Sequence, residues 1–170
     1  MVRKSDGVKM RVAQLSITNG LERERPRIAC RRTTDRKTVN QRPMDNSTNA
    51  LNWFEISVSD LGRAQKFYET VFKITMEAMD MPGMQMRNFP GDAMNGKVAG
   101  ALVKSDMHKP SATGSVIYLN GNPDLSDALG RVEKAGGKII MPKTEISPEI
   151  GHMAFFSDTE GNTVAMHSQN

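Results

Sequence analysis

The stretch WFEISVSDLGRAQKFYETVF, residues 53–72, contains two hydrophobic periods side by side. Its first seven residues largely alternate apolar and polar side chains and are rich in aromatic and β-branched types, which is typical of a strand. From Leu61 onward the apolar residues recur three and four positions apart, which predicts an amphipathic helix. Ser59 or Asp60 is placed to cap that helix. Its predicted buried stripe is Leu61, Ala64, Phe67, Tyr68, Val71 and Phe72.

Short apolar segments follow this helix. The segments at 74–79, 84–89 and 98–103 are separated by DMPG and FPGDAMNGK, in which proline and glycine mark turns. We therefore expect three further strands in the first half of the chain. The first half is predicted to run strand, helix, strand, strand, strand.

The second half repeats that order. SVIYLN (115–120) is a predicted strand, and a second amphipathic helix is expected from Asn122-Pro123 to Gly136. The predicted buried stripe of that helix is Leu125, Ala128, Leu129 and Val132. KIIMP, MAFFS and TVAMHS supply three more strands. An offset of 64 residues aligns the two halves and pairs Asp60-Leu61 with Asp124-Leu125. The sequence therefore predicts an α+β fold of two βαβββ modules.

These modules, opened by residues 53–72 and closed by GHMAFFSDTEGNTVAMHS (151–168), resemble the vicinal oxygen chelate (VOC) superfamily. That superfamily includes glyoxalases, extradiol dioxygenases and the bleomycin- and fosfomycin-resistance proteins. The resemblance rests on V-x-D-L-x-R-A-x-x-F-Y together with the D-x-E-G-N turn. It implies a glyoxalase-like domain over residues 50–170, whose two modules form a curved mixed sheet around a cleft. It also implies a small-molecule ligand, and we expect a homodimer.

Metal-dependent members of this superfamily carry His, Gln or Glu ligands on four strands that face the cleft. The corresponding positions here fall on Trp53, near Gly114, on Ala165, and within VAGALV (98–103), which has no donor side chain. Neither an indole nor a methyl group can coordinate a divalent ion. The resemblance therefore implies a ligand-binding domain without the usual metal, and we expect no cofactor.

Three donor side chains lie close to these positions and leave a second hypothesis open. Strand periodicity places Glu55 on the face of Trp53, and His167 on the face of Ala165. His152, just before MAFF, could reach the rim of the cleft. A displaced divalent metal on Glu55, His167 and His152 would make the protein a lyase or dioxygenase. Without a metal, Glu55 could be catalytic as a general base, or could recognise a polar group of the ligand.

The predicted cleft is mainly apolar with a few polar anchors, as small-molecule sites usually are. The unbranched methionine side chains could either form an adaptable wall of this cleft or fill gaps in the core. His108, within SDMHKPSATG, is expected to be solvated on a surface loop. A third hypothesis is a non-catalytic module that binds a partner protein. The predicted substrate-binding residues are Trp53, Glu55, Met86, Val116, Tyr118, Asn120, Ala165 and His167.

The first 49 residues differ from the rest in charge. They hold 12 of the 23 Lys and Arg but only 5 of the 19 Asp and Glu, and show no apolar period. We expect a disordered basic extension there, and Met44 could be the true start. The remainder is slightly acidic, which argues against nucleic-acid binding by the core. Cys30 is the only cysteine. A lone thiol and the lack of an apolar run near 20 residues favour a cytoplasmic protein without membrane contact.

Overall fold

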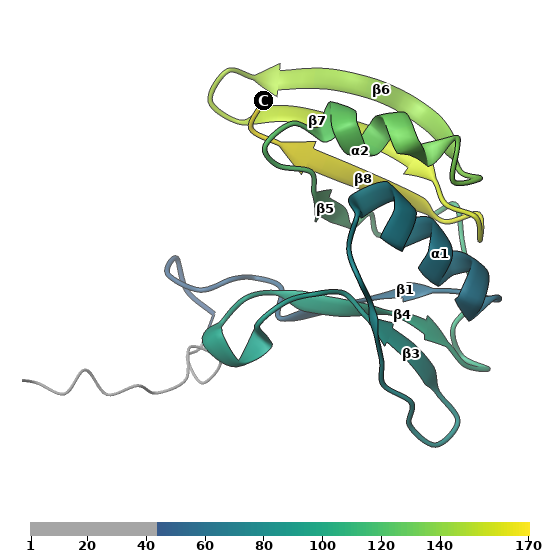
Figure 1. The fold of residues 1–170 in the computed structure, drawn as a ribbon. Helices are drawn as coiled ribbons and strands as arrows, with labels where there is room; N and C mark the ends of the chain where they lie inside the picture. The colour runs from purple at the N-terminus through teal and green to yellow at the C-terminus, as the bar shows by residue number, and fades with distance from the viewer. Residues whose placement is uncertain (1–43) are drawn as a thin grey trace, which may run out of the picture. The chain divides into compact units, whose positions relative to one another are not determined.

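The computed structural model describes residues 44–170. Its elements fall into two modules with the same order (Figure 1). The first module comprises β1 (Trp53–Ser57), α1 (Leu61–Phe72), β2 (Glu77–Ala78), β3 (Gln85–Asn88), a short 3-10 helix η2 (Ala93–Asn95) and β4 (Ala99–Lys104). The second comprises β5 (Tyr118–Asn120), α2 (Leu125–Val132), β6 (Lys138–Ser147), β7 (Gly151–Ser157) and β8 (Thr163–Ser168). The predicted basic extension lies outside the described residues, apart from 44–49.

Each module builds one four-stranded sheet with the same topology. The strand orders are β1-β4-β3-β2 and β5-β8-β7-β6. In both sheets the first strand pairs in parallel with the last, and the other pairs are antiparallel. β4 and β8 begin and end 64 residues apart, which is the offset that aligns the two halves of the sequence. The predicted α+β fold of two βαβββ modules is confirmed.

Both helices begin at an aspartate that caps the first turn. Asp60 Oδ1 accepts a hydrogen bond from Arg63 N at 2.9 Å, and Asp124 Oδ1 accepts one from Ser126 N at 2.8 Å. Each cap satisfies a backbone N–H that the helix leaves without an internal partner. The predicted buried stripes are confirmed, except that Phe72 is only half-buried.

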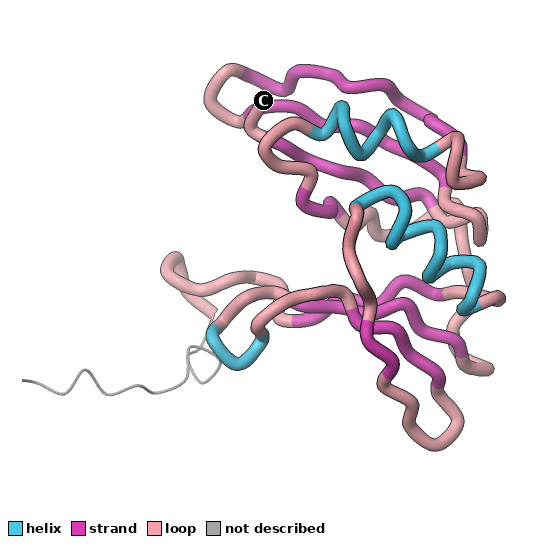
Figure 2. Tube along the Cα trace, viewed as in Figure 1, coloured by secondary structure: helices cyan, strands magenta, loops and turns pink. Residues whose placement is uncertain are grey.

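The two helices lie beside each other, each against its own sheet (Figure 2). Their apolar faces and the adjacent faces of both sheets form one core, which includes Ile56, Leu102, Phe156 and Met166. The two modules therefore share their buried apolar surface. No helix within residues 44–170 is long and apolar enough to cross a membrane.

A turn of the second module holds the first module's helix. In this turn, residues 158–162, Glu160 Oε2 accepts hydrogen bonds from Ser59 N at 2.9 Å and Asp60 N at 3.0 Å. Glu160 Oε1 accepts one from Arg63 Nε at 2.7 Å. Burial tends to raise the pKa of Glu160, but the Arg63 guanidinium and the two N–H groups outweigh it and hold that pKa below its usual range.

Asp158 of the same turn binds the centre of α1. The fully buried Tyr68 hydroxyl donates to Asp158 Oδ2 at 2.9 Å. Burial, followed by the nearby Asp158 carboxylate, raises the pKa of Tyr68 well above its usual value. Asn162 Nδ2 also donates to Ser57 O of β1 at 2.9 Å. The D-x-E-G-N turn thus joins the modules through polar contacts, and we call residues 158–162 the clasp turn.

Candidate functional site

Strand register places the predicted site residues on two sheet faces. Trp53 and Glu55 pair with Ala99 and Ala101, and so share the face of the first sheet opposite α1. In the second sheet, register pairs Tyr118 with Ala165 and Asn120 with His167, so these four side chains also share one face. The alternation expected from the sequence therefore holds on β1, β5 and β8.

Two of the predicted lining residues have no open surface. Met86 on β3 is 2% exposed and packs with Ala101 and Val103. Ala165 is fully buried. Val116 precedes β5 as an exposed side chain. The open apolar surface lies instead between the two modules.

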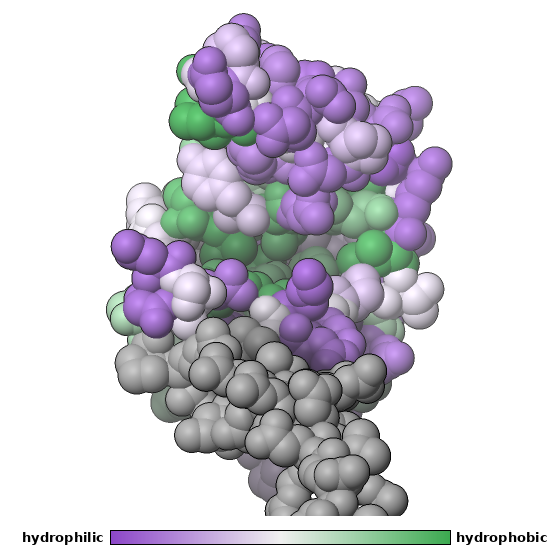
Figure 3. Space-filling view, turned by 90° about the vertical axis from the view of Figure 1, so that its left-hand side faces the viewer, coloured by the Kyte–Doolittle hydropathy of each residue, from purple (hydrophilic) through white to green (hydrophobic). Residues whose placement is uncertain are grey.

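An apolar hollow of about 380 Å³ lies between the two modules. In Figure 3, hydrophobic residues gather in a recessed band between two polar regions. None of the residues that line the hollow is charged. They are Phe54, Phe72, Ile74, Phe89, Pro90, Val98, Ala99, Tyr118, Leu119 and Asn120.

Two further hollows adjoin this one and have more polar walls. One, also of about 380 Å³, shares Phe89 and Ala99 with it and adds Trp53 and Asn88. The other, of about 330 Å³, shares Tyr118, Leu119 and Asn120 and adds Asn122 and His167. We call the three together the inter-module groove. Four residues predicted from the sequence line it, namely Trp53, Tyr118, Asn120 and His167.

Glu55 lies outside this groove and takes part in a hydrogen-bonded network. Trp53 Nε1 donates to Glu55 Oε1 at 3.1 Å. The ring nitrogen Nε2 of His108 lies 2.8 Å from Glu55 Oε2. The His108 side chain is 17% exposed, so the expectation of a solvated surface histidine is wrong. A turn in which His108 N donates to Ser105 O brings the imidazole to β1. Glu55 and His108 are 53 residues apart, and no local pattern links them.

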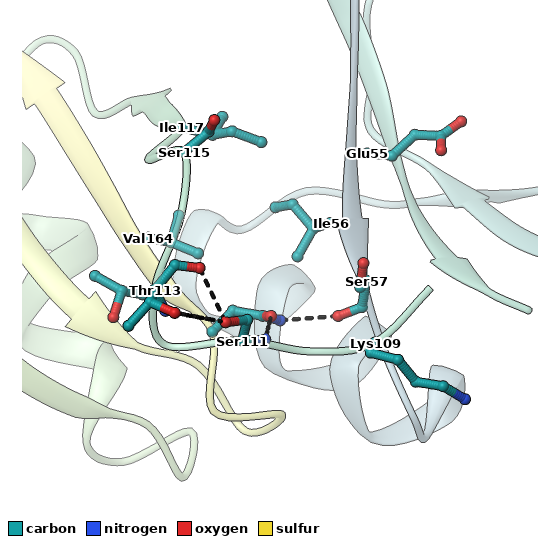
Figure 4. A pocket seen from close by; sticks show the side chains of 11 residues that line it. Glu55, Ile56, Ser57, Lys109, Ser111, Thr113, Ser115, Ile117 and Val164 are labelled. Carbon is teal, nitrogen blue, oxygen red and sulfur yellow. Dashed lines mark hydrogen bonds between the residues drawn. The ribbon is translucent and has the colours of Figure 1, made fainter. Parts of the chain in front are cut away.

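A smaller polar hollow of about 160 Å³ lies between β1, the segment 109–117 and the start of β8 (Figure 4). Figure 4 shows Glu55 and Ile56 extending from β1 in opposite directions. The Ser111 hydroxyl donates to Thr113 O at 2.9 Å, and Thr163 Oγ1 donates to Ala112 O at 3.0 Å. These hydroxyl groups therefore fix the inter-module segment in place.

The three histidines of the described chain lie in different surroundings. His167 Nε2 lies 2.7 Å from Ile150 O, and because a carbonyl only accepts, this nitrogen carries the proton. His152 on β7 is half-buried, and its Nδ1 has no hydrogen-bond partner. Within residues 44–170, no three His, Cys, Asp or Glu side chains form a group that could hold a metal.

The positions that correspond to family metal ligands do not fit a metal either. The Trp53 indole donates its only N–H to Glu55, and Ala165 offers a buried methyl group. Divalent ions bind carboxylate, imidazole or thiolate groups, and neither side chain supplies one. No chemical step is therefore assigned to a metal here.

Comparisons with known proteins relate the chain to glyoxalase and bleomycin-resistance proteins. The model of the family "Bleomycin resistance protein-like N-terminal" matches residues 51–87. The chain is 31% identical over 121 residues to a glyoxylase-like domain-containing protein of Didymella fabae. The aligned region covers 68% of this chain and 91% of that protein.

Solved structures share the fold. Glyoxalase I from Zea mays superposes with a TM-score of 0.55 at 20% identity, covering 69% of this chain and 45% of that chain. TnmS3, an antibiotic-binding protein from Streptomyces sp. CB03234, gives a TM-score of 0.55 at 19% identity, covering 74% of this chain and all of that chain. The chain thus spans less than half the length of the maize enzyme and the full length of the Streptomyces protein.

Proposed function

Because the chain belongs to the vicinal oxygen chelate superfamily, with glyoxalase- and bleomycin-resistance-like relatives, we propose that it binds a small, partly apolar molecule in the inter-module groove. The proposed binding needs no metal, since the side chains at the family's ligand positions cannot coordinate one. We also propose that the protein forms a homodimer, as many relatives do.

The central hollow carries this proposal. Aromatic side chains reach it from both modules, with Phe54, Phe72 and Phe89 on one side and Tyr118 on the other. Its volume of about 380 Å³ lies within the usual range of small-molecule sites, roughly 300–1,000 Å³. An ionised group placed there would lose its hydration without gaining a counter-charge. We therefore propose an uncharged ligand with a flat or cyclic body.

Polar groups at the two ends of the groove can orient such a ligand. At one end, Asn88 lines the groove, and its side-chain amide is the type of group that can form a hydrogen bond with a polar group of the ligand. At the other end, His167 donates from Nε2 to Ile150 O, which leaves Nδ1 as an acceptor. A ligand with polar groups at its edges and an apolar centre matches this distribution.

A thermal-shift screen with small uncharged aromatic compounds tests the proposal, because a ligand that binds only the folded state raises the melting temperature. Hits are then titrated by calorimetry against two variants. Tyr118→Ala removes an aromatic wall of the groove, and we expect it to weaken binding at least about 10-fold. Val116→Ala is the matched control, since Val116 is similarly exposed two residues earlier. Equal affinity in both variants, or no hit, contradicts the proposal.

Native mass spectrometry of freshly purified, untagged protein checks the remaining parts. We expect a dimer that carries no metal and in some molecules retains an organic ligand. One tightly bound equivalent of a transition metal would contradict binding without a metal. A monomer at micromolar concentration would contradict the proposed homodimer. It would not affect the ligand titrations, which test the binding proposal separately.

A further inference from the structure

A continuous chain of hydrogen bonds joins four side chains at one end of the first sheet. Ser105 Oγ lies 2.6 Å from His108 Nδ1, and His108 Nε2 lies 2.8 Å from Glu55 Oε2. Trp53 Nε1 completes the chain by donating to Glu55 Oε1 at 3.1 Å. We propose that Ser105 is a nucleophile that attacks small uncharged esters. In this proposal His108 is the general base, and the Glu55 carboxylate positions the His108 ring.

The contacts determine where the protons are when Glu55 is ionised and His108 is neutral. A carboxylate can only accept, so the imidazole proton lies on Nε2 and is donated to Glu55. The other ring nitrogen, Nδ1, then has a lone pair, and the Ser105 hydroxyl must donate to it. This is the arrangement in which an imidazole can remove a serine proton. Glu55 holds the required tautomer, and Trp53 holds Glu55.

The surroundings of Ser105 favour reaction at its oxygen. Met107 N donates to Ser105 Oγ at 3.3 Å, which helps to fix the position of the hydroxyl oxygen beside His108. Ser105 is half-buried directly after β4, so part of the residue is open to solvent. Met107 lies on the same turn and is 83% exposed, and its thioether offers an apolar contact for a short acyl chain.

The proposed reaction is ester hydrolysis in two balanced stages. Ser105 Oγ attacks the ester carbonyl carbon while its proton passes to His108 Nδ1. The C–O bond to the alcohol then breaks, the alcohol leaves with that proton, and the acyl group remains on Ser105. Water attacks the acyl-serine with His108 again accepting the proton, which releases the carboxylic acid and restores the serine hydroxyl. No oxidant, reductant or metal takes part.

Covalent labelling of the full-length protein tests the proposal without knowledge of the natural ester. A fluorophosphonate probe reacts with an activated serine by losing fluoride, and its adduct is located by peptide mass spectrometry. We expect one adduct, on Ser105. His108→Gln should slow labelling at least about 100-fold, since general-base catalysis contributes roughly 100- to 10,000-fold. Ser115→Ala, which removes an exposed serine of the polar hollow, is the matched control and should label as the wild type does.

The Glu55→Gln variant tests whether Glu55 positions His108 or only stabilises the fold. If Glu55 positions His108, this variant should lower the maximal labelling rate, while the probe concentration for half-maximal rate and the melting temperature stay unchanged. Hydrolysis of p-nitrophenyl acetate should fall in the same order across the variants. No adduct on Ser105 in the wild type, or equal labelling in the His108→Gln variant, would overturn the proposal whatever the stability of the variants.

Discussion

Replacement of Glu160 by glutamine tests how the clasp turn holds the two modules together. The Glu160 side chain is fully buried and accepts three N–H donors, from Ser59, Asp60 and Arg63. Glutamine presents one oxygen and one NH2 group. If the glutamine oxygen accepts the two backbone hydrogen bonds, its NH2 group faces the Arg63 guanidinium. Both of these groups only donate, so no hydrogen bond forms between them. At least one hydrogen bond and the negative charge are therefore lost.

The expected loss follows from the burial of each partner. A hydrogen bond to a charged group contributes about 1.5–3 kcal/mol, mostly when it is shielded from water. The Arg63 side chain is 52% exposed, so water screens its ion pair with Glu160 and the pair contributes little. The rest comes from the two backbone hydrogen bonds at the start of α1, which become weaker because their acceptor loses its negative charge. We expect Glu160→Gln to lower the free energy of unfolding by about 2–3 kcal/mol and the melting temperature by roughly 6–15 °C.

The pH dependence gives a second readout. The pKa of Glu160 is lower in the folded state than its usual value, which is about 4.3 in model peptides. A carboxylate of this kind stabilises the fold above its unfolded pKa, and this contribution is lost as the pH falls through the lower, folded pKa. The difference between the wild type and Glu160→Gln should therefore shrink below about pH 4.3.

Urea unfolding followed by far-ultraviolet circular dichroism, at pH values from 7 down to 3, measures both effects. Glu133→Gln is the control, because it makes the same chemical change at an exposed glutamate after α2. A loss below about 0.5 kcal/mol for Glu160→Gln at pH 7 would refute the energetic argument. A difference that does not change with pH would show that the carboxylate charge plays no part.

Two further stability predictions follow from the packing of the helices and sheets. Gly100→Ala would place a Cβ 2.5 Å from the Phe54 ring, and should destabilise the fold by about 1–3 kcal/mol. A Cβ added at Gly130 in α2 would meet no atom within 4 Å, so Gly130→Ala should stabilise the fold by about 0.5–1 kcal/mol. The melting temperatures of the Gly100→Ala and Gly130→Ala variants should therefore shift in opposite directions, and shifts in the same direction would contradict this reasoning. Tyr68→Phe leaves Asp158 without its hydroxyl donor, and should cost about 1–3 kcal/mol in urea unfolding, whereas an unchanged midpoint would show that this bond contributes nothing.

The order and type of the elements could be predicted from the sequence because they depend on local periods. The N-cap aspartates, the buried stripes of α1 and α2, and the alternation on β1 all follow from a few neighbouring side chains. Strand lengths were less predictable, since they depend on the partner strand. β5 covers only Tyr118–Asn120 of the predicted 115–120. β6 extends from the predicted 138–142 to Ser147, and as an edge strand it accommodates Pro142.

The site was predictable only where it depends on strand alternation. That rule placed Trp53, Tyr118, Asn120 and His167 on sheet faces, and all four line the groove. The aromatic floor of the groove, with Phe54 and Phe89, consists of side chains that the same rule assigns to the core. The contact between Glu55 and His108 depends on how one turn folds over β1. No pattern within a single segment contains that information.

The clasp turn also constrains how the protein can be synthesised. A ribosome releases the first module well before Asp158 and Glu160 have been added to the chain. During that interval the N–H groups of Ser59 and Asp60 and the hydroxyl of Tyr68 lack their acceptors, and the shared core has only one of its two sheets. The first module thus leaves the exit tunnel as an incomplete folding unit with an open apolar face. Its native contacts become available only after the clasp turn has been synthesised and has itself left the tunnel.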